Sequence, residues 1–218
     1  MKNKAVVFDF DGVILDTEIC RYESWNRVFI KYGLELPLDA WVQSIGRAHY
    51  VFDPFDILQG MVKEKLDRDQ LRALHKEYEL EIVKTTPVLP GVKERILEAK
   101  SLGIKLAVAS SSSRNWVDGN LSDRGLLQYF DATVCREDTQ RHKPMPDPYL
   151  AALRILNCEA KDAIAVEDSP PGIDAALAAG LTCIAVGCSL TRHLDLSKAH
   201  IRPFSLNEIS FKEIFSST

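Results

Sequence analysis

The fold class is decided by residues 4–12, which read Lys-Ala-Val-Val-Phe-Asp-Phe-Asp-Gly. The first five residues do not alternate between polar and apolar, which is typical of a parallel strand covered on both faces. Asp9 and Asp11 follow the carboxyl end of this strand, the edge at which open α/β sheets bind ligands. Because one residue separates them, both carboxylates can converge on one ion or substrate atom. For an isolated Asp-x-Asp-Gly, a turn capped by aspartates is the competing interpretation.

The rest of the chain separates into a helical part and an alternating part. Up to about residue 85 the apolar spacing is helical and predicts helices over 18–32, 38–45, 53–65 and 68–84. From residue 90 the patterns alternate and predict strands 104–109, 132–135, 163–167 and 182–186 with helices 92–100, 115–124, 147–156, 171–179 and 206–215. Repeated β-α units indicate an α/β fold with a doubly wound parallel sheet. We expect a core domain of residues 1–17 and 85–218 and an inserted helical domain of residues 18–84, joined by two linkers.

Three further motifs follow strands of the predicted sheet. The run Ser110-Ser111-Ser112-Ser113 ends one apolar strand, and Glu167-Asp168 ends another before Ser-Pro-Pro-Gly. The segment Lys143-Pro-Met-Pro-Asp-Pro lies in a loop between them. Since the carboxyl ends of parallel strands meet at one edge, these motifs are expected to gather near Asp9.

In this order, the four motifs resemble those of the haloacid dehalogenase (HAD) superfamily of phosphotransferases, and the resemblance covers nearly the whole chain. It implies a Rossmann-like core with a helical cap domain inserted between the first and second motifs, where residues 18–84 lie. It also implies an enzyme, a HAD-type phosphoric monoester hydrolase. Each motif alone is weak evidence, but four in the family's order reinforce one another.

The resemblance implies a role for each acid. Asp9 would be the nucleophile that forms an aspartyl-phosphate, and Asp11 would protonate the leaving oxygen and later activate water. An ionised carboxylate that attacks a phosphate dianion needs a cation between them, so Mg²⁺ is implied as cofactor. Its ligands would be Asp9, the backbone carbonyl of Asp11, and Asp168. Glu167 would contact these ligands or reach the ion through a water molecule.

The resemblance also implies how the phosphoryl group is bound. The Ser110 hydroxyl and the Ser111 amide would donate hydrogen bonds to it, and Lys143 would neutralise the phosphate and the nucleophile. We interpret Ser112 and Ser113 as a helix N-cap. Arg47, within the predicted cap domain, is a candidate for holding an anionic or hydroxyl-rich part of the substrate, and a surface salt bridge is its alternative. No role is assigned to Arg114, Asn115, His49 or His142.

Three functions compete. The first is a Mg²⁺-dependent phosphatase of a small phosphorylated, sugar-like metabolite. The second is a sugar-phosphate mutase similar to β-phosphoglucomutase, but such mutases use a cap histidine where this chain has Arg21, which favours hydrolysis. The third is a catalytically silent binding module on the same fold. Such modules usually lack an acid or the lysine, and this chain has all of them.

The composition of the chain argues against some classes of binding partner. The chain has 218 residues, 27% of them charged, and a net charge of −4 without a basic stripe, which argues against nucleic acid as the main partner. No apolar run approaches the ~20 residues that span a bilayer, and no signal-like segment precedes the first strand. We therefore expect a cytoplasmic protein, a monomer, without a membrane partner. The five scattered cysteines are expected to be reduced and mostly buried.

Overall fold

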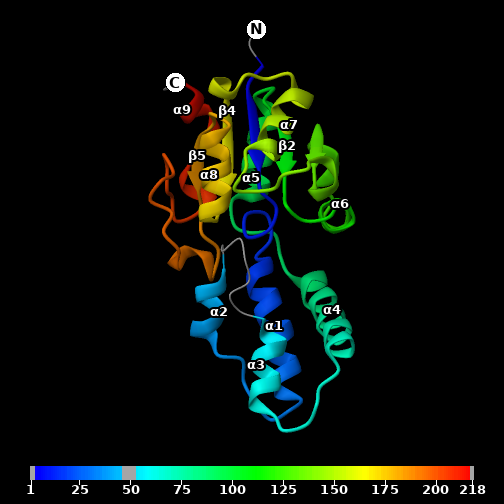
Figure 1. Cartoon of the computed structure of the whole chain (residues 1–218). Helices are drawn as coiled ribbons and strands as arrows, with labels where there is room; N and C mark the ends of the chain where they lie inside the picture. The colour runs from blue at the N-terminus through cyan, green and yellow to red at the C-terminus, as the bar shows by residue number, and fades with distance from the viewer. Residues whose placement is uncertain (1–2, 46–52, 217–218) are drawn as a thin grey trace. The chain divides into compact units, whose positions relative to one another are not determined.

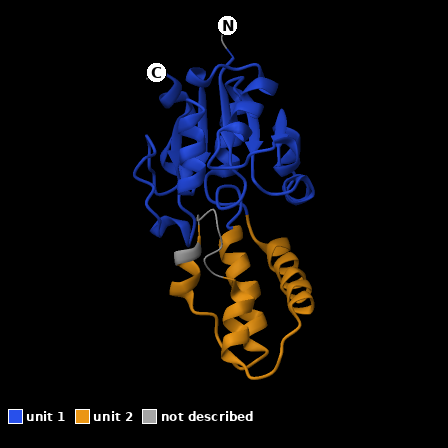
Figure 2. Cartoon of the chain, in the orientation of Figure 1, with its two compact units in different colours: residues 1–16, 88–218 blue, residues 17–87 orange. Residues whose placement is uncertain are grey.

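The computed structural model describes residues 3–45 and 53–216. The chain divides into two compact units (Figure 2). The core unit consists of residues 1–16 and 88–218, and the helical unit of residues 17–87. Sequence analysis placed the helical part at 18–84, and its role as a cap domain stays a prediction.

The core unit is built on a five-stranded parallel sheet (Figure 1). Its strands are β1 (Ala5–Phe8), β2 (Lys105–Ala109), β3 (Ala132–Val134), β4 (Ala163–Glu167) and β5 (Thr182–Ala185). The strand order is β3-β2-β1-β4-β5, so β1 is central and pairs with β2 on one side and β4 on the other. This arrangement confirms the predicted α/β fold with a parallel sheet.

Both faces of the sheet are covered. Helices α7 (Asp147–Leu156) and α8 (Pro170–Ala178) share an apolar cluster with Ala5 and Val7 of β1. Phe8 belongs to the opposite face, where its ring lies edge-on to that of Phe211 at 6.1 Å between centroids. That face carries α5 (Val92–Ser101) and α9 (Phe211–Ser216), while α6 (Arg114–Asp123) packs against β3. Consecutive residues of a strand point to opposite faces of the sheet. Because both faces are covered here, consecutive residues of β1 must all be apolar, which explains why its sequence does not alternate between polar and apolar residues.

The predicted C-terminal helix over 206–215 is wrong as one element. The segment contains a 3₁₀ turn at Leu206–Glu208 and then α9, with Ile209 in an extended conformation between them. The Glu98 carboxylate on α5 accepts hydrogen bonds from the backbone N–H groups of Phe211 and Lys212, each at 3.3 Å. Because this side chain satisfies the donors at the start of α9, a contact distant in sequence sets where the helix begins.

The helical unit contains α1 (Thr17–Ile30), α2 (Leu38–Ser44), α3 (Pro54–Met61) and α4 (Arg68–Thr85). Helices α1 and α4 pack against each other, and α1 buries Trp25, Val28 and Phe29 at helical spacing. Helix α3 is shorter than the predicted 53–65 because Val62 is extended and ends it. Across residues 3–45 and 53–216, no helix has the length and apolar character required to cross a bilayer.

The insertion leaves and rejoins the core at adjacent points of the backbone. The Leu89 N–H donates to the Ile14 carbonyl at 2.9 Å, and Leu15 forms an isolated bridge with Val88. The chain can therefore carry residues 17–87 between β1 and β2 without disturbing the sheet order. All five cysteines are free and four are buried, as expected.

Candidate active site

Three carboxylates gather at the carboxyl edge of the sheet. The Asp9 backbone N–H donates to the Val166 carbonyl at 2.8 Å, which ties the end of β1 to β4. One carboxylate oxygen each from Asp9, Glu167 and Asp168 lies within 4.8 Å of the other two, and all three residues are buried. Such a group of buried acids requires positive charge nearby.

Lys143 supplies part of this charge. Its Nζ lies 2.6 Å from Asp9 Oδ1 and 2.6 Å from Glu167 Oε1, and its side chain is only 8% exposed. Burial alone would lower the pKa of Lys143, but the carboxylates of Asp9 and Glu167 outweigh it and raise the pKa above its ordinary value. The ammonium group therefore stays protonated and holds the ends of β1 and β4 together.

Lys143 does not fully compensate the burial of Asp9. Burial, together with the charges of Glu167 and Asp11, raises the pKa of Asp9 from 3.8 to about 7 in spite of the opposing effect of Lys143. A nucleophilic carboxylate must be ionised. The site therefore needs additional positive charge for Asp9 to be mainly ionised at neutral pH.

The residues present fit a hard divalent cation. Carboxylate and carbonyl oxygens are the ligands that Mg²⁺ prefers. Gly12, with φ of +82°, leaves room for the Asp168 carboxylate, because a Cβ at this position would lie 1.8 Å from Asp168 Oδ2. Glu167 is already engaged by the Lys143 ammonium, by the Tyr149 hydroxyl and, at 3.2 Å, by the backbone N–H of Asp168. Asp9 and Asp168 are thus better suited as direct ligands than Glu167.

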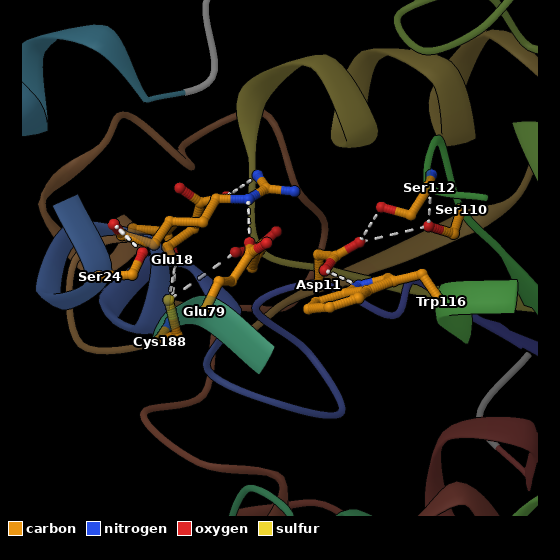
Figure 3. A network of polar contacts seen from close by, with 11 residues as sticks. Asp11, Glu18, Ser24, Glu79, Ser110, Ser112, Trp116 and Cys188 are labelled. Carbon is orange, nitrogen blue, oxygen red and sulfur yellow. Dashed lines mark hydrogen bonds and ion pairs between the residues drawn. The ribbon is translucent and has the colours of Figure 1, made fainter. Parts of the chain in front are cut away.

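The side chain of Asp11 belongs to a second cluster (Figure 3). Trp116 Nε1 donates to Asp11 Oδ1 at 2.9 Å, and the Ser112 hydroxyl bonds to Asp11 Oδ2. The Ser110 hydroxyl lies 3.5 Å from the same oxygen and accepts from the Ser112 N–H at 3.0 Å. Ser110 is buried, whereas Ser111 is exposed at the start of the loop.

The interpretation of Ser113 as a helix cap is confirmed for its position, because it is the N-cap residue of α6, although its side chain forms no capping hydrogen bond. The same interpretation is wrong for Ser112, whose hydroxyl contacts Asp11. The serine run turns toward Asp11 because β1 and β2 are neighbours in the sheet, which is not visible in the local sequence.

Two residues near the acids were not singled out from the sequence. Tyr149 is fully buried on α7, donates to Glu167, and has its ring 5.1 Å from Lys143 Nζ. Trp116 lies in the first turn of α6 and reaches Asp11. Tyr149 could have been identified from the sequence, because it lies six residues after Lys143 in an apolar helix. A tyrosine hydroxyl buried there needs a hydrogen-bond partner.

The structure describes some of the residues to which the motifs assign no role, and others lie outside its described part. Arg114 has a structural position, since its guanidinium donates to Thr133 Oγ1 at 2.8 Å and pairs with Asp138, joining α6 to β3 and the loop after it. Asn115 is exposed. Arg47 and His49 lie outside the described residues, so the substrate role of Arg47 stays a prediction.

Arg21 lies in an ion-pair network of the helical unit. Its guanidinium is 3.0 Å from Glu18 Oε1 and 3.4 Å from Glu79 Oε1, both labelled in Figure 3. Lys76 pairs with the other Glu79 oxygen at 2.6 Å. Arg21 is therefore held between two carboxylates on α1 and α4.

Comparisons with known proteins identify relatives of this chain. Residues 6–186 match the family described as haloacid dehalogenase-like hydrolase. The chain is 38% identical over 188 residues to a Bacillus subtilis protein named "Putative phosphatase YhcW", covering 86% of this chain and 85% of the relative. It is 32% identical over 178 residues to the phosphorylated carbohydrates phosphatase of Thermotoga maritima, covering 82% of each. A crystal structure titled "putative beta-phosphoglucomutase from Thermotoga maritima" superposes with a TM-score of 0.79 at 28% identity, over 98% of this chain and 97% of that one.

Proposed function

We propose a function from the premise that this chain belongs to the haloacid dehalogenase-like hydrolase family. The protein is a Mg²⁺-dependent phosphatase of a small phosphorylated, sugar-like metabolite, and it works through an aspartyl-phosphate on Asp9. The observation that carries this proposal is the Lys143 ammonium at 2.6 Å from both Asp9 and Glu167, beside Asp168 at the sheet edge.

The first step forms the covalent intermediate. A carboxylate oxygen of Asp9 attacks phosphorus, the ester P–O bond breaks, and the leaving oxygen takes a proton from Asp11. Ser110 and the Ser111 amide stabilise the transferring group through hydrogen bonds. In the second step Asp11 takes a proton from water, the water oxygen attacks phosphorus, and the Asp9 carboxylate leaves as inorganic phosphate forms.

Charge stabilisation is shared between the protein and the cation. Asp9, Asp168 and the Asp11 carbonyl would hold Mg²⁺, which would supply positive charge that reduces the repulsion between nucleophile and phosphate. Lys143 neutralises Asp9, and Glu167 orients Lys143. The raised pKa of Asp9 supports this division, because one buried ammonium leaves that carboxylate with a pKa of about 7.

The substrate class rests on the relatives. One of them is named for phosphorylated carbohydrates, which supports a sugar phosphate here. The solved structure named for a β-phosphoglucomutase keeps the mutase as the second candidate. Against it stands Arg21, where the mutases resembled by this chain use a histidine, because a guanidinium stays protonated and cannot relay a proton. Its pairing with Glu18 and Glu79 further supports a non-catalytic role.

A screen of phosphorylated sugars with Mg²⁺ tests the proposal. We expect release of inorganic phosphate from a monophosphate without a bisphosphate activator, loss of release in excess chelator, and recovery on adding Mg²⁺. Ca²⁺ should substitute poorly, because its larger and less regular shell misplaces the nucleophile. Interconversion of hexose 1- and 6-phosphates with little free phosphate would identify a mutase. Full activity in chelator would exclude the metal scheme, and binding without any turnover would indicate the silent module.

A further inference from the structure

We propose that Trp116 is a positioning residue that fixes the orientation of the Asp11 carboxyl group and thereby determines which of its oxygens carries the transferable proton. The proposal deepens the proposed function and rests on it for the role of Asp11. The contact itself lies entirely within the core unit.

The contact joins two segments that are far apart in sequence. Trp116 Nε1 lies 2.9 Å from Asp11 Oδ1 across 105 positions of the chain. The indole belongs to the first turn of α6, directly after the serine loop that ends β2. Figure 3 shows Asp11 between the Trp116 ring and the hydroxyls of Ser112 and Ser110. Asp11 is therefore attached to the same loop that carries the proposed phosphoryl-binding groups.

The chemistry of the donors differs between the two carboxyl oxygens. An indole N–H can only donate, so Oδ1 must be an acceptor in this arrangement. A serine hydroxyl can donate or accept, so the contact of Ser112 with Oδ2 is compatible with a protonated and an unprotonated oxygen. Because the unprotonated oxygen of a carboxylic acid is the stronger acceptor, the indole N–H favours Oδ1 as the unprotonated oxygen and Oδ2 as the oxygen that gives and takes the proton. Without the indole N–H, the carboxyl group can rotate and the proton is no longer directed.

The contact can be tested without any activity. With ¹⁵N-labelled tryptophan, the three indole N–H resonances of Trp25, Trp41 and Trp116 can be assigned through single Trp→Phe variants. We expect Asp11→Ala to move the Trp116 resonance more than the other two, because only this indole donates to Asp11 among the hydrogen bonds of the described residues. A Trp116 resonance that does not move would overturn the proposal, whether or not the protein is a phosphatase.

The positioning role is tested with two leaving groups. An alkyl phosphate such as glycerol phosphate needs a proton on its leaving oxygen, whereas p-nitrophenyl phosphate has a good leaving group and depends on it little. We expect Trp116→Phe to lower kcat/KM for the alkyl ester at least about tenfold more than for the aryl ester. Trp25→Phe, which removes an indole stacked on His75 in the helical unit, should leave the ratio unchanged.

A merely structural Trp116 would lower both values of kcat/KM by the same factor, and that result would overturn the positioning role. If Trp116→Phe does not fold, Ser112→Ala probes the same carboxyl group from its other oxygen and should change the ratio in the same direction. An unchanged ratio in a folded Ser112→Ala, together with an unmoved Trp116 resonance, would also contradict the proposal. Absence of turnover in the wild-type protein would instead refute the proposed function, while the resonance test would still stand.

Discussion

The ion pair at the candidate site of the core unit and an ion pair of the helical unit differ sharply in burial. In the core unit, Lys143 and Glu167 form an ion pair with side chains that are 8% and 0% exposed. In the helical unit, Arg27 and Glu81 form a pair at 3.1 Å with side chains that are 45% and 67% exposed. A buried charge is costly to remove from water and depends on its partners, whereas an exposed pair contributes little. The buried pair therefore depends on its partners much more than the exposed pair does.

Glu79 shows that the contrast is not absolute. This carboxylate of the helical unit is buried, and it is balanced by Lys76 at 2.6 Å and Arg21 at 3.4 Å. Glu79 therefore resembles the core acids in that its buried charge is paired with cations, in this case two of them. What distinguishes the core site, within the part of the chain that the structure describes, is that Lys143 is shared between two acids and a third buried acid lies beside them.

The largest effect is expected at Asp9. Asp9→Asn keeps the shape of the side chain but removes the nucleophile, so kcat should fall on the order of 10⁴-fold or more. Initial rates of phosphate release measure it. Asp123→Asn, at an exposed position, should keep wild-type activity. Near-normal turnover in Asp9→Asn would contradict the aspartyl-phosphate mechanism.

The two ion pairs can be compared directly by removing one cation from each. Lys143→Met leaves two buried carboxylates without their ammonium and should destabilise the fold by about 3–5 kcal/mol. Arg27→Met should cost no more than about 1 kcal/mol. Urea unfolding of both variants at one pH measures the difference. Equal losses would show that burial does not distinguish the two regions.

The same Gly→Ala substitution at two positions tests whether the candidate metal site requires the space that a glycine leaves. Gly12→Ala places a Cβ against the Asp168 carboxylate at a left-handed φ, so it should displace a proposed metal ligand. We expect weaker Mg²⁺ binding and about a hundredfold lower kcat. Gly60, inside α3, has no atom within 4 Å of such a Cβ. Gly60→Ala should stabilise the helical unit by about 0.5–1 kcal/mol and leave kcat unchanged. Titration of activity with Mg²⁺ and thermal unfolding separate the two outcomes.

The last effect is confined to the helical unit and concerns His75, which stacks on Trp25 at 4.6 Å between ring centroids. Burial, together with the charges of Arg21 and Lys76, lowers the pKa of His75 from 6.5 to about 4 against the opposing effect of Glu79. Between pH 6.5 and 4 the unfolded chain binds this proton and the folded chain does not. Stability is therefore lost as the pH falls through this window, by about 1–2 kcal/mol.

His75→Phe keeps a ring against Trp25 but cannot titrate. Urea unfolding at pH 7 and pH 5 should show a smaller acid-induced loss of stability in this variant than in the wild-type protein. The same loss in both would show that the folded and unfolded states bind the His75 proton equally well.

The sequence was sufficient to predict those elements whose bounds depend on the residues within them. The helix at 147–156 and the strand at 163–167 have the predicted bounds, because amphipathic spacing and an apolar run flanked by polar residues are local signals. The positions of the four motifs at one edge also followed from the sequence, since parallel strands present their carboxyl ends together. Asp9 and Asp168 could therefore be placed at this edge before the structure was known, whereas Lys143 and the roles of all three residues came from the resemblance to the HAD superfamily.

Tertiary structure alone decided which of these groups touch. The expectation that Glu167 assists a metal stays a prediction. The structure adds that its Oε1 accepts hydrogen bonds from Lys143 and Tyr149, because β4 lies beside β1 and α7 covers that face. Trp116 meets Asp11 because β2 is the other neighbour of β1. The Trp116–Asp11 pair spans 105 positions of the chain, and Lys143 and Tyr149 lie 24 and 18 positions before Glu167. These pairings depend on strand order, so no short window of sequence predicts them. The residue types at the site follow from the sequence, whereas the partner of each oxygen follows from the order of the strands.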